Sequence, residues 1–309
     1  MLIALAAPLP VLAADEKLSV VATTGMIADT ARRIGGDLAD VRALMGPGVD
    51  PHAYRQTRTD IVAMARADLV LWNGLFLEAQ MEDVLGDLTR HTNVRAVAEA
   101  LPKLKLVAHD DYANRFDPHV WMDPALWHDV AIDIRDAMTA AAPKNAAVFE
   151  VNTKALLTEI TALSDYATRV LASVPEEARV LVTAHDAFNY FGRAYGFEVI
   201  GIQGISTESE AGLNRITALV DTLVKRNIQS VFVESSVSDR SIRALIEGTA
   251  ARGHEVRIGG ELYSDAMGAP GTYEGTYIGM IDHNVTVIAS GLGGIVPDRG
   301  MSGKLGFGS

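Results

Sequence analysis

The chain has 309 residues, of which 49% are hydrophobic and 21% are charged, a composition typical of a globular protein of about two domains. Its formal net charge of −12 at pH 7 would repel a phosphate backbone, which argues against a nucleic-acid partner. It contains no cysteine, and this excludes disulfides, cysteine-based zinc sites, iron–sulfur clusters and thiol catalysis. A metal site in this chain would therefore use histidine and carboxylate ligands.

An apolar run at the amino terminus, residues 2–13, has the length of the hydrophobic segment of a secretory signal peptide. It ends in Ala13-Ala14 before a charged segment, so we expect residues 1–14 to be a signal peptide. The run is too short to cross a bilayer as a helix, which needs about 20 apolar residues. The alternative is a buried terminal strand or helix. We expect the mature chain to be free in a bacterial periplasm and, because it lacks cysteine, not to be a lipoprotein.

From Leu18 onward, short β-branched runs alternate with amphipathic helical stretches, which predicts an α/β fold with mainly parallel sheets. In an N-terminal α/β lobe, residues 15–143, strands are expected at 18–23, 41–45, 68–72 and 95–97, and helices at 27–34, 60–66 and 125–141. In a C-terminal α/β lobe, residues 175–293, strands are expected at 180–183, 198–202, 230–234 and 255–258, and helices at 211–225, 240–251 and 277–290.

The segment between the two lobes, residues 144–174, contains neither glycine nor proline and carries apolar residues at helical spacing. A continuous helix here would be about 45 Å long and would connect the lobes rigidly. The alternative is two shorter helices with a break near Asn152 and Thr153. After the second lobe, residues 294–309 are glycine-rich and aperiodic, and we expect a flexible tail.

Three of the eight histidines lie at or after the carboxyl ends of predicted strands. His52 follows the strand at 41–45, His119 lies in an Asp-Pro-His segment, and His185 directly follows residues 180–184. Asp265 follows the last predicted strand, in a glycine-rich loop. Ligands of open α/β sheets collect at this edge, and a cleft between the lobes would bring the four side chains together.

Three neutral imidazoles and one carboxylate form a donor set that suits Zn²⁺ and that also accepts Mn²⁺ or Fe²⁺. A single histidine in a loop is more often a surface or hydrogen-bonding residue, and this reading is preferred for the remaining five. They are His91, His109, His128, His254 and His283.

Six segments in collinear order carry a resemblance to a known family. They are Val21-Ala22-Thr23-Thr24-Gly25-Met26, Asp50-Pro51-His52-Ala53-Tyr54, residues 117–124 (DPHVWMDP), residues 183–191 (TAHDAFNYF), Val233-Glu234-Ser235-Ser236 and Gly260-Glu261-Leu262-Tyr263-Ser264-Asp265. Between Leu18 and about Leu292 the chain closely resembles the zinc- and manganese-binding solute-binding proteins of bacterial ABC importers (cluster A-I, or cluster 9).

The resemblance implies two α/β lobes joined by one long helix, with His52, His119, His185 and Asp265 as the metal ligands in the interlobe cleft. It implies high-affinity binding of a divalent metal and its delivery to an ABC importer permease in the inner membrane. A periplasmic metallochaperone is a further candidate partner, and we expect a monomer that is not an enzyme.

The position of His185 bears on the metal. Manganese-selective relatives usually have glutamate there, whereas histidine is typical of the zinc-binding members, so we expect Zn(II), with Mn(II) or Fe(II) as the alternative. Many zinc-binding members also carry a long histidine-rich loop before the second ligand. Here that stretch, residues 105–115, is short and holds only His109.

Two other functions compete with a metal receptor. A secreted zinc hydrolase would need an open water position and a carboxylate base, for which Glu261 is the nearest candidate in the last loop. No His-Glu-x-x-His or Gly-x-Ser-x-Gly motif is present. A receptor for a chelated metal or an organic solute would need an aromatic cleft, yet only Tyr54, Trp121 and Tyr263 flank the candidate site.

Overall fold

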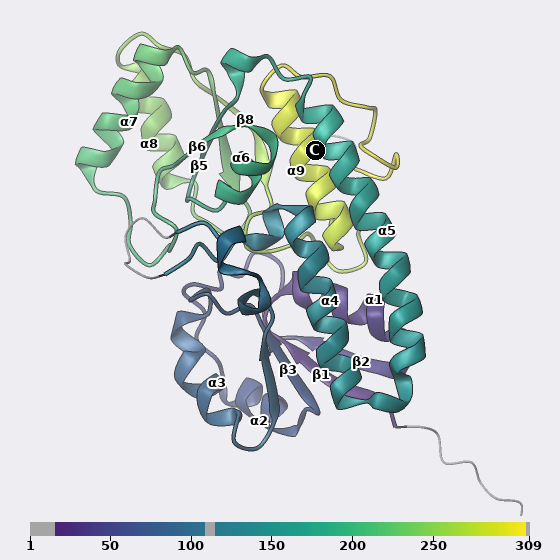
Figure 1. Cartoon of the computed structure of the whole chain (residues 1–309). Helices are drawn as coiled ribbons and strands as arrows, with labels where there is room; N and C mark the ends of the chain where they lie inside the picture. Colours follow the sequence, from purple (N-terminus) through teal and green to yellow (C-terminus); the bar gives the residue numbers. More distant parts are fainter. Residues whose placement is uncertain (1–15, 109–114, 307–309) are drawn as a thin grey trace, which may run out of the picture.

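The computed structural model describes residues 16–108 and 115–306 as two α/β lobes joined by one long helix (Figure 1). The expected signal peptide and His109 lie outside the described residues. Within the described ranges, no helix combines the length and the apolar character needed to cross a membrane.

The N-terminal lobe contains a four-stranded parallel sheet in the order β2-β1-β3-β4. Its strands are β1 (Leu18–Ala22), β2 (Ala39–Ala43), β3 (Leu69–Trp72) and β4 (Asn93–Ala96). Its helices are α1 (Gly25–Gly35), α2 (Arg58–Arg66), α3 (Glu82–Leu88) and α4 (Pro124–Ala141). Local sequence sets where two of these helices begin. Thr57 and Asp60 form a capping box on α2, and Asp123 caps α4 immediately before a proline at its first position.

The C-terminal lobe repeats this plan with parallel strand pairs β5-β6 and β7-β8, and β5 lies beside β7. Its strands are β5 (Val180–Thr183), β6 (Glu198–Gly201), β7 (Ser230–Glu234) and β8 (Arg257–Leu262). Its helices are α6 (Asn189–Tyr195), α7 (Leu213–Arg226), α8 (Arg240–Ala250) and α9 (Tyr277–Gly291). The predicted fold class, two α/β lobes with parallel sheets, is confirmed.

The connection between the lobes is a single helix, α5 (Ala146–Leu171), without a break at Asn152 and Thr153. The Asn152 side chain donates to the carbonyl of Ile34 on α1, and the Thr153 hydroxyl donates to the carbonyl of Phe149 one turn earlier. One buried face of α5 packs against α1, α4 and α9, and in Figure 1 α5 runs past both lobes. The largest hydrophobic core therefore extends from the first sheet through α5 to α9.

Three details differ from the sequence predictions. The short helices α3 and α6 were not predicted, because each has only seven residues and shows little periodicity. Strand β8 extends to Leu262, past two glycines that were predicted to end it. Gly260 has a φ of +153°, a conformation that other residues rarely adopt, and the register shifts between Val231 and Phe232 opposite it.

The tail also differs from the expected flexible segment. In residues 294–306, Gly300 and Leu305 are buried, although most of the other residues are exposed. The Met301 amide donates to both oxygens of the Asp282 side chain at 2.9 and 3.0 Å. Composition alone predicted a flexible tail here because it does not reveal a buried carboxylate on α9 that binds the tail backbone.

Candidate metal centre

The structure brings the four predicted site residues together between the lobes. His52 lies in the loop after β2 and His119 lies just before a 3₁₀ turn that leads into α4, so both belong to the N-terminal lobe. His185 and Asp265 lie in the loops after β5 and β8 in the C-terminal lobe. One potential ligand atom from each residue lies within 4.8 Å of the corresponding atom of every other residue. Each lobe thus supplies two of the four side chains.

The nitrogen atoms that face one another are the Nε2 atoms. His52 Nε2 and His119 Nε2 are 3.3 Å apart. The Asp265 carboxylate lies between the other two rings, with Oδ1 3.3 Å from His119 Nε2 and Oδ2 3.2 Å from His185 Nε2. Three imidazoles and a carboxylate therefore converge on one point with the donor atoms that a tetrahedral zinc site uses.

These four side chains are almost completely removed from solvent, with exposed fractions of 3% or less. His185 Nε2 and both Asp265 oxygens are buried and, among the described residues, have no hydrogen-bond partner outside the four side chains of this group. Buried polar atoms without partners are rare because each one loses the hydrogen bonds that water would provide. Their arrangement around a common centre fits a cation, which would satisfy all of them at once.

Two buried carboxylates orient two of the histidine rings. Asp117 Oδ1 accepts from the backbone amide of His119 at 2.9 Å and lies 2.7 Å from its Nδ1. Glu234, at the end of β7, does the same for His185, with distances of 2.9 Å to the amide and 2.5 Å to Nδ1. A proton on each Nδ1 leaves Nε2 as the free donor atom, as is usual for carboxylate-supported metal ligands.

Sequence reasoning assigned no role to these two carboxylates. For Asp117 a signal was present, because the tripeptide Asp-Pro-His occurs at residues 50–52 and again at 117–119. In both copies the aspartate accepts a hydrogen bond from the backbone amide of the histidine two residues later. Glu234 lies 49 residues from His185 in the chain, so only the tertiary structure shows its role.

The three histidines of the centre have different pKa values, because different charged groups lie beside them. Burial lowers the pKa of His52 to about 3. Burial also lowers the pKa of His119, but the nearby Asp117 and Asp265 carboxylates outweigh it and raise that pKa to about 9. In the same way Glu234 and Asp265 outweigh burial and hold the pKa of His185 well above its usual value. Without a metal, His119 and His185 therefore hold a second proton at neutral pH, whereas His52 is neutral.

The three aromatic residues near the site do not form an organic-ligand cleft. Trp121 is buried, packs edge-on against the His119 ring, and donates from Nε1 to the Ser264 carbonyl of the other lobe. The Tyr54 hydroxyl donates to Asp60, and the Tyr263 ring packs against His283. Of these three aromatic residues, only Trp121 contacts a histidine of the candidate metal centre.

Glu261, the candidate base of a hydrolase, is exposed on β8, and its carbonyl accepts from His283 Nε2. The His254 ring bonds to the carbonyl of Ile228, and His91 and His128 lie outside the candidate metal centre. Nothing in the described residues supports the hydrolase.

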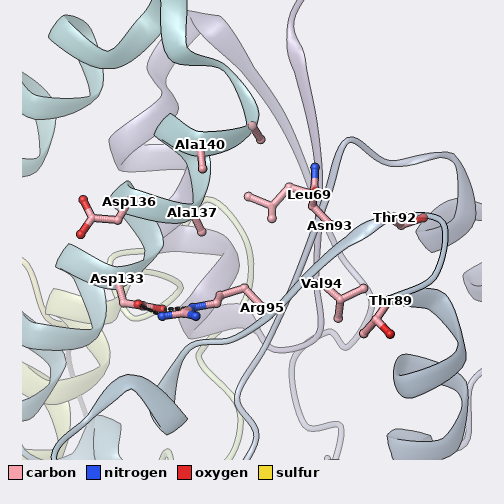
Figure 2. Close-up of a pocket in the computed structure, with 11 residues that line it drawn as sticks. Leu69, Thr89, Thr92, Asn93, Val94, Arg95, Asp133, Asp136, Ala137 and Ala140 are labelled. Atoms are coloured by element: carbon pink, nitrogen blue, oxygen red, sulfur yellow. Dashed lines mark hydrogen bonds and ion pairs between the residues drawn. The ribbon is translucent and has the colours of Figure 1, made fainter.

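Two pockets of about 510 Å³ differ in their relation to this centre. One lies between β4 and α4, where Arg95 Nε donates to Asp133 at 2.8 Å, and none of the four candidate ligands lines it (Figure 2). The other is bordered by residues 43–47 and by the loop from Asp265 to Thr276. Of the four candidate ligands, Asp265 alone is among the residues that line this second pocket.

Comparison with known proteins shows the family to which the chain belongs. Residues 20–291 match the family described as zinc-uptake complex component A, periplasmic (ZnuA). The chain is 48% identical over 279 residues to the manganese-binding lipoprotein MntA of Bacillus subtilis, covering 90% of this chain and 91% of the relative. It is 44% identical over 280 residues to the zinc-binding protein TroA of Treponema pallidum, covering 91% and 90% of the two chains.

The solved structure of periplasmic zinc-binding protein TroA from Treponema pallidum superposes with a TM-score of 0.87 at 43% identity, over 89% of this chain and 99% of that one. The matched family is described as a component of a zinc-uptake complex and the two relatives are named as metal-binding proteins, so the prediction that this protein is not an enzyme is confirmed. The name of MntA includes "lipoprotein", which conflicts with the expectation that this chain carries no lipid anchor. The chain belongs to the ZnuA family of metal-binding receptors of ABC importers, as its sequence motifs predicted.

Proposed function

We propose that the protein binds one divalent transition-metal ion between its lobes through His52, His119, His185 and Asp265, and delivers it to an ABC importer permease from the periplasm. The observation that carries this proposal is the convergence of four buried side chains whose ligand atoms lie within 4.8 Å of one another. The Asp265 oxygens support it as well, because they are buried and their polar neighbours among the described residues are the histidine rings of the same group. A monomeric state and a periplasmic metallochaperone remain predictions.

Zinc is the proposed ion because of the donor set. Three imidazole nitrogens favour a borderline-soft cation, and nitrogen sites generally bind Zn²⁺ more tightly than Mn²⁺. Four protein donors also match the number that a closed tetrahedral zinc site takes. The relative TroA, 44% identical, is named as a zinc-binding protein.

Manganese is the second candidate, favoured by the 48% identity to a relative that is named as manganese-binding. Mn²⁺ prefers more oxygen donors than this group offers, since Asp265 contributes the only carboxylate among the four side chains. The choice between the two ions therefore depends on whether ligand type or overall similarity predicts selectivity better.

Metal analysis of protein purified without chelators, followed by competition between Zn²⁺ and Mn²⁺, tests the proposal. We expect one ion per chain and a preference for Zn²⁺ at equal free concentrations. His185→Ala should reduce affinity by about a hundredfold or more, whereas His91→Ala, which changes an exposed histidine, should leave it unchanged. Full affinity in His185→Ala would remove this residue from the site, and a wild type that prefers Mn²⁺ would overturn the choice of zinc.

His185→Glu tests the role of ligand type directly. It adds oxygen donors and a negative charge at one position, so the preference should shift toward Mn²⁺ relative to the wild type. The same competition titration measures this shift. An unchanged ratio of the two affinities would show that the side chain at position 185 does not set selectivity.

A further inference from the structure

The three histidines of the metal centre are not held equally. His119 and His185 each have an Nδ1 within hydrogen-bonding distance of a buried carboxylate, at 2.7 and 2.5 Å. Among the described residues, no hydrogen bond to His52 Nδ1 is present, although the His52 backbone is held by Asp50. His52 is also the most exposed of the four side chains, at 3%. Its ring is therefore the one that can leave the centre without breaking a bond to a carboxylate.

The loops that carry the two N-terminal histidines are also tied to the opposite lobe in different ways. The segment around His119 makes four hydrogen bonds to the C-terminal lobe. Asp117 accepts from Asn189 at its side chain and from Tyr190 at its carbonyl, while Trp121 donates to Ser264 and accepts from Tyr277. These contacts bury this segment completely at the lobe interface.

The segment that carries His52, residues 44–56, is here named the His52 loop. Among the described residues it has one hydrogen bond to the C-terminal lobe, from the Thr207 hydroxyl to Asp50 Oδ2 at 2.5 Å. The other oxygen of the same carboxylate, Oδ1, accepts the backbone amide of His52 at 2.8 Å. Asp50 therefore couples the position of a candidate ligand to a residue of the opposite lobe.

Thr207 belongs to the connection between β6 and α7, residues 202–212, which reaches across to the N-terminal lobe. The next residue, Glu208, accepts a hydrogen bond from the Gln80 side chain of that lobe. A Cβ added at Gly48 in the His52 loop would lie 3.4 Å from the carbonyl oxygen of Ser235, the residue after β7. The connection thus contacts the His52 loop through Thr207 and a neighbouring part of the N-terminal lobe through Glu208.

The pocket that Asp265 lines also borders the His52 loop. Its lining includes residues 45–47 of the His52 loop, three residues of α1, and residues between Asp265 and Thr276. An outward movement of the His52 loop would widen this pocket toward the ligand atoms. The segment around His119, held by its four interlobe bonds, would stay in place.

We propose that the Asp50–Thr207 hydrogen bond latches the His52 loop over the metal centre, and that this loop is the gate through which the ion enters and leaves. The inference rests on the proposed metal-binding function. Thr207 is a positioning residue, since it acts on His52 through Asp50 and does not contact the centre itself. Opening of the latch frees the loop and withdraws one ligand of four while the other three keep their places.

The test of the latch is the rate at which loaded protein releases Zn²⁺ into an excess of a chromogenic chelator, followed by stopped-flow absorbance. Thr207→Val removes the hydroxyl at nearly constant shape, and loss of a hydrogen bond to a carboxylate should speed release by about tenfold. Thr207→Ser restores the hydroxyl and should release at close to the wild-type rate. Thr217→Val is the matched control, because Thr217 is an exposed threonine on α7 that bonds only within its own helix.

Amide hydrogen exchange in the metal-free protein provides a second measurement that does not depend on a bound ion. Thr207→Val should speed exchange in residues 46–52 by about tenfold and leave residues 117–123 unchanged. Equal release rates in wild type and Thr207→Val, a Thr207→Ser variant as fast as Thr207→Val, or equal loosening of both segments would each overturn the latch. A wild type that binds no metal would instead refute the proposed function, and the exchange data would still decide the latch.

Discussion

At the scale of single residues, the candidate metal centre depends on carboxylates that hold its histidines in place but are not themselves candidate ligands. Asp117 and Glu234 each bind both the backbone amide and Nδ1 of one histidine, and thereby fix the ring and its proton. Asp50 binds only the backbone of His52. The Asp-Pro-His tripeptide at residues 117–119 therefore supports both the ring and the main chain of its histidine, whereas the copy at residues 50–52 supports only the main chain.

Asp117→Asn tests this support. The amide can still accept the backbone hydrogen bond of His119, but it loses the charge that holds the proton on Nδ1. We expect metal affinity to fall by about 10- to 100-fold, as is typical when the partner of a metal-bound histidine is removed. Competition titration with Zn²⁺ measures the change. Asp129→Asn, at a half-exposed carboxylate paired with Lys105, is the control, and an equal loss in both variants would contradict the assigned role.

The pKa values make metal binding depend on pH over a wide range. The raised pKa values of His119, about 9, and of His185 mean that each ring must lose a proton before Nε2 can bind a cation. The lowered pKa of His52, about 3, means that this ring is already neutral. Binding at pH 7 should therefore release about two protons, and affinity should fall with decreasing pH from about pH 9 rather than only below the usual histidine value.

Calorimetric titrations of the metal-free protein in two buffers with different ionisation enthalpies give the number of protons released at each pH. The direction of the effect is set by the carboxylates, because they stabilise the protonated rings that compete with the metal. A release of no protons at pH 7, together with an affinity that is flat between pH 9 and 6, would contradict the assigned protonation states.

At the scale of elements, α5 does more than connect two lobes. Its buried face contributes to the core that also contains residues of α1, α4 and α9, so the last helix of the chain packs against the first lobe. The aromatic stack of Trp127 on Tyr277, with ring centroids 5.2 Å apart, belongs to the same contact. Stability of the helix therefore depends on tertiary packing along its length rather than on its own hydrogen bonds.

Leu163→Ala measures this packing. Leu163 is fully buried in α5, so its truncation should lower the free energy of unfolding by about 3 kcal/mol through lost burial and an internal cavity. Val151 lies on the same helix and is 68% exposed, so Val151→Ala should change the free energy of unfolding by less than about 0.5 kcal/mol. Chemical denaturation of the metal-free proteins measures both values. Similar losses of unfolding free energy in the two variants would contradict the conclusion that one face of α5 packs in the core.

At the scale of the whole molecule, the continuous α5 and the shared core limit how far the lobes can move apart. The helix has no glycine or proline between its ends and no break at Asn152 and Thr153. A hinge would have to break the packing between α5 and its three neighbouring helices. Motion that accompanies metal binding should therefore be concentrated in loops, as the proposed His52 gate requires.

Small-angle X-ray scattering of the metal-free and metal-loaded protein tests this expectation. The two curves should nearly superimpose, because displacement of a loop of about a dozen residues barely changes the overall dimensions. A clear compaction on addition of Zn²⁺ would show that the lobes close about a hinge and that α5 bends or separates from its neighbours.

The fold class, most of the helices and strands, the long helix and the family could all be predicted from the amino-acid sequence. The physical reason is that the strands and helices of an α/β lobe each show a periodic pattern of apolar residues in the sequence. Ligands of such lobes collect at the carboxyl ends of the strands, where His52, His185 and Asp265 were expected. The sequence also singled out His119 through its Asp-Pro-His segment. Local pattern was weak for the seven-residue helices α3 and α6 and for the glycines inside β8.

The groups that surround those ligands could not be predicted from the sequence, because they are distant from the ligands in the chain and meet them through the fold. Glu234 reaches His185 from another strand, and Thr207 reaches Asp50 from the opposite lobe, 157 residues away. The position of Met301 in the tail likewise involves a distant partner, the buried Asp282 carboxylate of α9, which accepts its backbone amide. Such contacts fix the protonation and the mobility of each histidine, and both arise from neighbours in space rather than in sequence.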